Sequence, residues 1–229
     1  MPGEQLFTNR PLPGARLNMA HPLTRGLVGC WLLNETGGIR AMDLSPYGNH
    51  GRLVGFASPV RRPFNGLPFD GVDDYVDVGN GASLNVTGPF SIELWVKFTA
   101  YLNGGIIDKN YSSDGWMLWS QSDPLVALYV NNAHQVEMTS PALSVWSHTA
   151  AVMDSVSSRI YLGGVLKNTG TSTFPTGNSS DAVVIGKDFN LGRFSNVVLG
   201  IVRVYNRALN AQEIKELYMN PYGMILRRR

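Results

Sequence analysis

The chain has 229 residues, of which 44% are hydrophobic and 16% are charged. An average soluble protein has about 25% charged residues, so this composition excludes intrinsic disorder and long solvated helices. The formal net charge is +2, and it falls to −1 without the terminal Arg227, Arg228 and Arg229, which leaves no basic face for nucleic acid. The single cysteine, Cys30, excludes an internal disulfide. No apolar run approaches the roughly 20 residues of a membrane-spanning helix, so we expect no membrane insertion.

The first 25 residues contain six prolines and glycines and show no hydrophobic period. This composition predicts an extended N-terminal arm over residues 1–25, long enough to reach a neighbouring subunit. The arm lacks the basic-then-apolar pattern of a signal peptide, so Sec-dependent export is not expected. A folded domain over residues 26–219 and a basic C-terminal tail over residues 220–229 complete the predicted organisation.

From residue 27 onward, short runs of β-branched and aromatic residues are separated by turn dipeptides, which is typical of a sandwich. The clearest run is FSIELWVKF at 90–98. Its apolar residues Ile92, Leu94 and Val96 alternate with Glu93 and Trp95, which predicts a long half-buried strand. We expect further strands at 27–33, 69–79, 105–108, 115–121, 126–130, 135–138, 147–153, 159–162, 182–185 and 197–205. So many strands require two packed sheets.

One segment near the C-terminus has the pattern of a helix. Asn210 precedes AQEIKELY and can cap it, with Glu213 at the capping-box position. Ile214 and Leu217 form its apolar face, and Pro221 ends it. The sequence therefore predicts one short C-terminal helix beside the β domain.

Seven segments between residues 26 and 218 together resemble a known family. They are GLVGCWLLNETGG, DLSPYGNHG, FDGVDDYVDVG, SIELWVKF, WSHTAAVMDSVSSRIYLGGVL, VVIGKD and VRVYNRALNAQEIKELY. In this order they resemble the laminin G-like or concanavalin A-like jelly-roll domains of lectins and glucanases, of the kind that phages encode. The resemblance implies an all-β fold, a two-sheet antiparallel jelly-roll sandwich, in agreement with the expected strands.

The arm before Gly26 and the tail YGMILRRR resemble those of phage-encoded members of this family. That resemblance implies display on a virion, as a capsid decoration, head-fibre or tail-associated protein. Virion proteins assemble in the host cytoplasm and are released by lysis, which would explain the missing signal peptide. The implied partners are a viral capsid or tail protein, neighbouring copies of the chain, and cell-surface polysaccharide.

Some members of the resembled family cleave glucans with two carboxylates on one strand face, about 5–5.5 Å apart in retaining enzymes. Glu93 is the one glutamate in a suitable strand, and its same-face neighbours are Ser91 and Trp95. The local partner carboxylate is missing, so we predict a protein without enzymatic activity. A glycoside hydrolase with a pair assembled from distant strands is the lesser alternative.

A structural calcium is the one cofactor that the sequence indicates. The loop DLSPYGNHG supplies Asp43 and Asn49, and a tight turn can add backbone carbonyls. In the resembled family an acidic residue just before the VRVYN segment often completes this site, but Gly200 and Ile201 stand there. The alternative is that Asp43 only caps its own turn. A second acidic cluster is interpreted as a solvated strand edge, and it comprises Asp70, Asp73, Asp74 and Asp77.

Glycan binding would use exposed aromatic rings beside polar groups. The segment DKNYSSDGWMLW and the loop before it place such residues near one hairpin. The candidate carbohydrate-binding residues are Tyr101, Asp108, Lys109, Tyr111, Asp114 and Trp116. The alternative for such aromatic residues is core packing, which we expect for Trp95, Trp119 and Trp146.

Both ends of the chain carry candidate docking residues, which are Arg10, Arg16, Arg25, Arg227, Arg228 and Arg229. They could bind an acidic capsid surface or a second subunit, and disordered ends are the alternative. The sequence thus favours a non-enzymatic virion surface module that uses a lectin-like jelly roll for display or adhesion. The alternative is a carbohydrate-binding lectin or adhesin that is not tied to a capsid.

Overall fold

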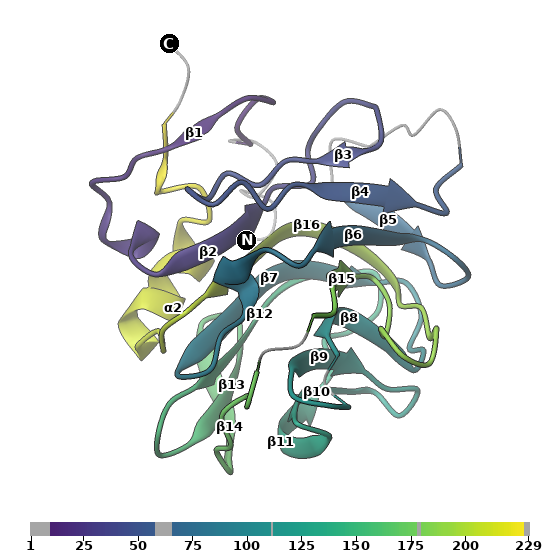
Figure 1. Cartoon of the computed structure of the whole chain (residues 1–229), viewed down its shortest axis with the longest axis vertical. Helices are drawn as coiled ribbons and strands as arrows, with labels where there is room; N and C mark the ends of the chain where they lie inside the picture. The colour runs from purple at the N-terminus through teal and green to yellow at the C-terminus, as the bar shows by residue number, and fades with distance from the viewer. Residues whose placement is uncertain (1–9, 58–65, 111, 178–179, 227–229) are drawn as a thin grey trace.

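The computed structural model describes residues 10–57, 66–110, 112–177 and 180–226. Two antiparallel sheets pack face to face as a sandwich, with one α-helix beside them among the described residues (Figure 1). The predicted all-β, two-sheet antiparallel sandwich is confirmed. None of the helices in the described ranges is long and apolar enough to cross a membrane.

The strand order of the eight-stranded sheet is β11-β10-β9-β8-β15-β6-β4-β3. Its strands are β3 (Arg40–Ala41), β4 (Gly51–Val54), β6 (Tyr75–Gly79), β8 (Gly104–Lys109), β9 (Trp116–Ser120), β10 (Leu125–Val130), β11 (Ala133–Thr139) and β15 (Val183–Ile185). The other sheet has the order β14-β13-β12-β7-β16-β2, with β5 also paired to β16. Its strands are β2 (Leu27–Trp31), β5 (Leu67–Asp70), β7 (Phe90–Phe98), β12 (Trp146–Met153), β13 (Ser158–Leu162), β14 (Val165–Gly170) and β16 (Asn196–Tyr205).

The main hydrophobic core lies between the two sheets. The predicted inward face of 90–98 is confirmed, because Ile92, Leu94 and Val96 all belong to this core. Trp31 and Trp116 are buried in the same core, which therefore contains large rings from both sheets. Burial of this surface stabilises the sandwich by roughly 25 cal/mol per Å² of apolar area.

A second hydrophobic core covers the outer face of the seven-stranded sheet. Helix α2 (Ala211–Met219) packs here through Ile214 and Leu217, and its predicted capping box between Asn210 and Glu213 is present. The expectation that strand 90–98 is half-buried is wrong, because its outward Trp95 is 1% exposed beneath this cover. The sequence pattern of one strand could not show that a distant helix shields its second face.

The described part of the expected arm is packed, which corrects its interpretation as an unpacked extension. Strand β1 (Arg16–Leu17) pairs with β17 (Ile225–Leu226), so the two ends of the chain form a terminal ribbon, visible in Figure 1 as the purple and yellow strands beside each other. Leu17 and Leu23 are buried in the second core with Ile225. The predicted domain boundary at residue 26 remains a prediction. The pairing of β1 with β17 joins residues about 210 positions apart, so no local sequence pattern could indicate it.

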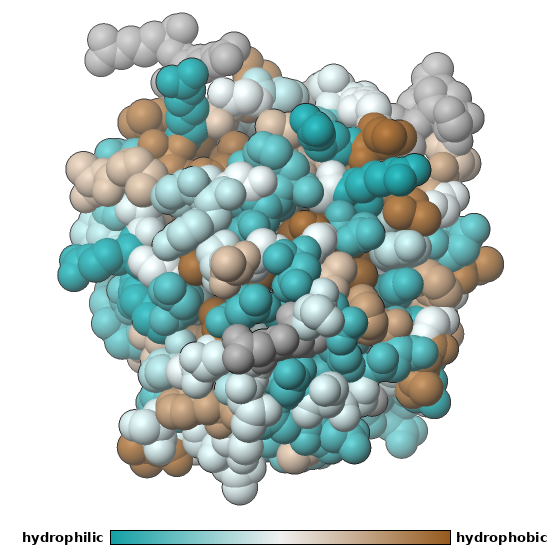
Figure 2. Space-filling view, in the orientation of Figure 1, coloured by the Kyte–Doolittle hydropathy of each residue, from teal (hydrophilic) through white to brown (hydrophobic). Residues whose placement is uncertain are grey.

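Exposed apolar side chains lie in several separate places on the face that Figure 2 shows. The face shown in Figure 2 is mainly hydrophilic across its middle, with apolar groups at the upper left near β1 and at the upper right near the ends of β4 and β5. Isolated apolar side chains of this kind are normal on a soluble domain. A groove of about 710 Å³ accompanies the apolar surface near β5.

A buried polar cluster links the central strands to the second core. Arg203 of β16 lies opposite Glu93 of β7, and its Nη1 donates to Glu93 Oε2 at 2.7 Å. His148 Nε2 lies 3.1 Å from Glu93 Oε1, and Arg203 Nη2 donates to the carbonyl of Pro221. All three charged or titratable side chains are 0% exposed. Burial raises the pKa of Glu93, but the adjacent Arg203 and His148 outweigh it and hold that pKa below its ordinary value.

We predict that Glu93→Gln lowers the free energy of unfolding by about 3–5 kcal/mol at pH 7, because it leaves Arg203 buried without its counter-ion. Its carboxylate has a depressed pKa, so the wild type should lose this contribution as the pH falls below the ordinary value of 4.5, whereas the variant has none to lose. Urea unfolding at several pH values measures both effects. Glu216→Gln, on the exposed side of α2, is the control, and an equal loss in both variants would contradict the prediction.

Candidate functional site

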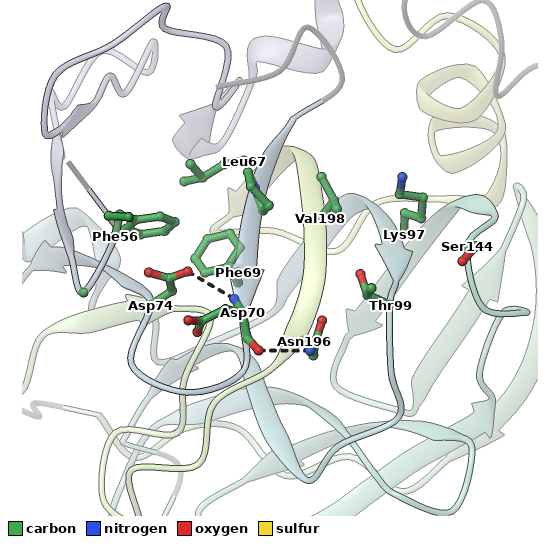
Figure 3. A pocket seen from close by; sticks show the side chains of 13 residues that line it. Phe56, Leu67, Phe69, Asp70, Asp74, Lys97, Thr99, Ser144, Asn196 and Val198 are labelled. Atoms are coloured by element: carbon green, nitrogen blue, oxygen red, sulfur yellow. Dashed lines mark hydrogen bonds between the residues drawn. The ribbon is translucent and has the colours of Figure 1, made fainter. Parts of the chain in front are cut away.

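A groove of about 710 Å³ lies on the outer face of the seven-stranded sheet, where β5, β16 and β7 run side by side. Figure 3 shows its lining side chains: Phe56 and Asp74 lie on one side of β5, and Lys97, Thr99 and Ser144 lie on the far side. Segments that are distant in the sequence therefore build one surface.

Two cross-strand rows form the lining of this groove. In the first row, Val198 of β16 lies opposite both Pro68 of β5 and Lys97 of β7. In the second row, Asn196 lies opposite Asp70, and its Nδ2 donates to the Asp70 carbonyl at 2.9 Å. Because alternate residues of a strand share a face, one row is mainly apolar and the neighbouring row is polar.

The apolar side of the groove is held in place by the main core. Phe69 is 2% exposed, and the ring of Phe56 packs edge-on against it with centroids 5.3 Å apart. Phe56 remains half-buried, so part of its ring stays accessible at the groove. The opposite side of the groove carries the positive charge of Lys97. Lys97 Nζ also lies 5.8 Å from the centre of the Trp146 ring.

Three carboxylates form an acidic cluster at the near end of the groove. Each of Asp70, Asp73 and Asp74 places an oxygen within 4.8 Å of the others, a grouping that could hold a metal ion. Asp70 and Asp73 are exposed, as expected for a solvated strand edge, but Asp74 is only 7% exposed. The interpretation of this cluster as a solvated edge is therefore wrong for Asp74, which the turn folds inward against β5.

Burial raises the pKa of Asp74 to about 6, and repulsion by Asp70 and Asp73 adds to the shift. One hydrogen bond opposes it, because the Asp70 amide donates to Asp74 Oδ2 at 3.1 Å (Figure 3). A carboxyl group with a perturbed pKa inside a groove is a common feature of functional sites. At neutral pH this end of the groove offers hydrogen-bond acceptors, while Lys97 offers a donor on the far side.

The structure does not bring the predicted carbohydrate-binding residues together on an exposed surface. Trp116 is 0% exposed and packs against Phe90 in the main core, so its ring is not available for stacking. Asp108 and Lys109 are also buried. The error has a physical reason, because β8 and β9 are central strands and are covered on both faces.

The remaining members of that predicted patch have other contacts. The Tyr101 hydroxyl donates to the Pro141 carbonyl at 2.9 Å, and its ring packs against the main core. Asp114 is half-buried, and Tyr111 lies outside the described residues. Carbohydrate binding remains a prediction for Tyr101, Asp114 and Tyr111.

The predicted calcium ligand Asp43 is fully used by protein donors. Its Oδ1 accepts the amides of Cys30 and Ser45, both at 2.8 Å, and its Oδ2 accepts the Asn49 amide and the Ser45 hydroxyl. The Asn49 side chain donates to the Val28 carbonyl. These are the contacts of a turn-capping aspartate, the alternative to a metal ligand.

The predicted docking arginines differ in their surroundings. Arg10 Nη2 donates to the carbonyls of Leu32 and Leu33, at 2.9 and 3.1 Å, and so fastens the start of the arm to the sandwich. Arg16 and Arg25 are exposed. The other three, Arg227, Arg228 and Arg229, lie outside the described residues.

Sequence reasoning found the acidic cluster but missed the groove. Lys97 and Asn196 are about a hundred residues apart in the sequence, and only the pairing of β7 with β16 brings them together. The available signal was the polar Lys97 near the end of the strand over 90–98. No local pattern connects it with Asp70 or Asn196.

Comparison with known proteins gives a family and a fold. The model of the concanavalin A-like lectin/glucanases superfamily matches residues 70–215. The receptor binding domain of botulinum neurotoxin C/D mosaic serotype superposes with a TM-score of 0.68 at 14% identity, covering 84% of this chain and 51% of that one. Trypanosoma rangeli sialidase superposes with a TM-score of 0.63 at 20% identity, covering 87% and 33%. The chain thus spans about half of the toxin domain, and no curated protein sequence matches it.

We predict that Asp74→Asn raises the melting temperature at pH 7.5. The wild-type pKa is raised from 3.8 to about 6, so the wild type loses stability as the pH rises through this interval, and the uncharged variant does not. Asparagine still accepts the Asp70 amide, so the fold is retained. Calorimetry should show a clear difference at pH 7.5 and almost none at pH 3.5, where the wild-type side chain is protonated. Asp123→Asn, at an exposed turn, should change neither value, and a lower melting temperature for Asp74→Asn at pH 7.5 would refute the assignment.

Proposed function

Because the chain belongs to the concanavalin A-like lectin/glucanase superfamily, we propose that it is a non-enzymatic carbohydrate-binding module whose groove between Phe56 and Lys97 holds the sugar. The single observation that carries this proposal is the lining of that groove. It joins an apolar strip to a row of polar groups on a fold shared with a toxin receptor binding domain. Ligand sites commonly combine apolar walls with a few convergent polar groups.

Each side of the groove suits one part of a sugar ring. The accessible edge of Phe56 and the side chains of Pro68 and Val198 offer an apolar surface to the C–H groups of a pyranose. Asp70 and Asn196 carry hydrogen-bonding groups for its hydroxyls in the neighbouring row. A groove open to solvent also lets a longer polysaccharide continue past the bound unit.

The same structure argues against a glycoside hydrolase that uses Glu93 as a catalytic carboxylate. Glu93 is 0% exposed and bound to Arg203, so substrate cannot reach it. A hydrolase would instead need Asp74 as the acid and Asp70 as its partner. Release of reducing sugar from a bound polysaccharide, abolished by Asp74→Asn, would replace the binding proposal with this one.

We predict that Lys97→Ala weakens glycan binding about tenfold or more, since a hydrogen bond to a charged group contributes about 1.5–3 kcal/mol. A glycan array first identifies a ligand for the wild type, and calorimetric titration then measures its affinity. Lys167→Ala is the matched control, because this lysine also lies on a strand but lines a different groove, between β11 and β14. Equal affinities for wild type and Lys97→Ala, or an array without signal, would count against the proposal.

We further propose that the module is displayed on a virion surface and is held there by its terminal ribbon, with a capsid or tail protein as its partner. The supporting observation is that β1 and β17, from the first and last parts of the described chain, pair at one edge of the domain, away from the groove. The exposed Arg16 and Arg25 lie in the same terminal segment. A module held there would present its groove outward.

Charge reversal at the ribbon should separate attachment from sugar binding. We predict that the double variant Arg16→Glu, Arg25→Glu co-sediments with virions at least tenfold less than wild type, because two attractive charges become repulsive. Its glycan affinity should not change. Lys167→Glu is the control for a charge reversal away from the ribbon, and undiminished co-sedimentation of the double variant would contradict docking through these arginines.

A further inference from the structure

The groove on the outer face of the seven-stranded sheet has opposite charges on its two sides. Among the described residues that line it, three are charged, and two of these, Asp70 and Asp74, lie on the side of β5. The third, Lys97, lies on the far side, as Figure 3 shows. A ligand that carries one negative group is therefore repelled on one side of the groove and attracted on the other.

Lys97 lies beside an aromatic ring but has no anionic partner in the part of the chain that the structure describes. Trp146 of β12 lies opposite Lys97 on one side, and Val198 of β16 lies opposite it on the other. The attraction between a cation and an indole ring keeps Lys97 Nζ near Trp146, 5.8 Å from the ring centre. Within residues 10–57, 66–110, 112–177 and 180–226, Lys97 forms no ion pair or hydrogen bond through its side chain. Its ammonium group can therefore bind an anion from outside the chain.

Two hydroxyl groups line the same side of the groove as Lys97. Thr99 follows Lys97 by two residues, and Ser144 comes from the loop before β12. Both residues are exposed, and neither hydroxyl forms a hydrogen bond with the described residues. The Ser144 amide donates to the Phe98 carbonyl at 2.8 Å, which fastens this loop to the end of β7. An ammonium group with two hydroxyls nearby is a set of donors that suits an oxyanion.

Ser144 also has a backbone conformation that is unfavourable for its residue type. Its φ is 62°, in the left-handed region, where a residue with a Cβ atom is strained. Strained residues of this kind cluster at ligand sites, where the surrounding structure holds them in place. Here the strained residue lines the groove on the side of Lys97 (Figure 3). The backbone thus indicates a binding function for this side, independently of the charges.

We propose that the groove selects sugars that carry a negatively charged group, a carboxylate or a sulfate ester, and that Lys97 binds this group. The inference rests on the proposed function, because it names the class of glycan for the same site. Thr99 and Ser144 donate to the other oxygens of the anionic group. The opposite orientation is disfavoured, because it places the negative group of the sugar against the carboxylate of Asp70.

The experiment uses the full-length protein and one glycan array in four copies: untreated, methyl-esterified at its carboxylates, desulfated, and treated in both ways. We expect the wild type to bind glycans with acidic sugars on the untreated copy and to lose this signal on the doubly treated copy. The two single treatments identify which group Lys97 binds. The affinity for a purified acidic ligand should also fall as the sodium chloride concentration rises, because salt screens the attraction.

Lys97→Met tests the role of the charge, because it keeps an unbranched side chain of similar length beside Trp146. This variant should bind the acidic ligand about tenfold more weakly, the effect of losing one charge-assisted hydrogen bond. It should also bind untreated and doubly treated glycans equally. Lys97→Arg should keep the preference of the wild type. Lys167→Met, in the groove between β11 and β14, is the matched control and should behave as the wild type does.

Failure of this inference can be told apart from failure of the proposed function. Equal binding of the wild type to the untreated and doubly treated copies overturns the preference for acidic sugars and leaves carbohydrate binding intact. An array without signal on any copy overturns both. A preference that survives in Lys97→Met overturns the assignment to Lys97. If Lys97→Met melts below the wild type, Lys97→Gln repeats the test with a polar, uncharged side chain.

Discussion

The buried ion pair between Glu93 and Arg203 is the constraint on which the outer half of the molecule depends. Each charge is tolerable inside the protein only if its remaining polar atoms are also satisfied. The Arg203 guanidinium gains a second acceptor in the carbonyl of Pro221, which Nη2 contacts, so the segment after α2 must be in place. The aromatic ring of Trp95 extends the same arrangement, since Tyr218 of α2 stacks on it with centroids 5.9 Å apart. The terminal segments are for this reason part of the folded domain and not additions to it.

That cover also determines where a ligand can bind. Along β7 the outward residues are Glu93, Trp95 and Lys97, and their environments change in this order from a buried charge to a buried ring to a half-buried side chain at the groove. The second core covers the first two, and β7 emerges from it at the end nearest β5. The groove proposed for the sugar therefore lies at this end of the outer face, and the terminal ribbon lies at the other. The two proposed roles use separate parts of one sheet, so a partner at the ribbon need not obstruct the groove.

The elements with a strong local period could be predicted from the sequence, and the surfaces that depend on pairing could not. Alternation placed Ile92, Leu94 and Val96 in the main core correctly, and the capping box located α2. The same alternation gave no information on what lies beyond the opposite face of β7, so the strand was expected to be half-buried. Trp116 shows the corresponding limit for a site, because an aromatic residue beside polar ones has the same local pattern whether its ring faces sugar or the core. The groove needed Pro68, Val198 and Lys97 in one row, which only the register of three strands creates.

The buried acidic residues fall into two groups, according to whether hydrogen bonds and counter-ions compensate the cost of burying their charge. Asp43 has four donors and Glu93 has a counter-ion, so for both the cost of burial is balanced within the fold. Asp74 accepts one hydrogen bond, from the Asp70 amide, and its charge is repelled by the carboxylates of Asp70 and Asp73. An asparagine at this position could accept the same hydrogen bond without carrying a negative charge. Asp188 Oδ2 accepts no hydrogen bond from the part of the chain that the structure describes. A buried carboxylate whose charge is not compensated lowers the stability of the fold. By this criterion Asp43 and Glu93 are structural, whereas the described contacts do not account for the burial of Asp74 and Asp188.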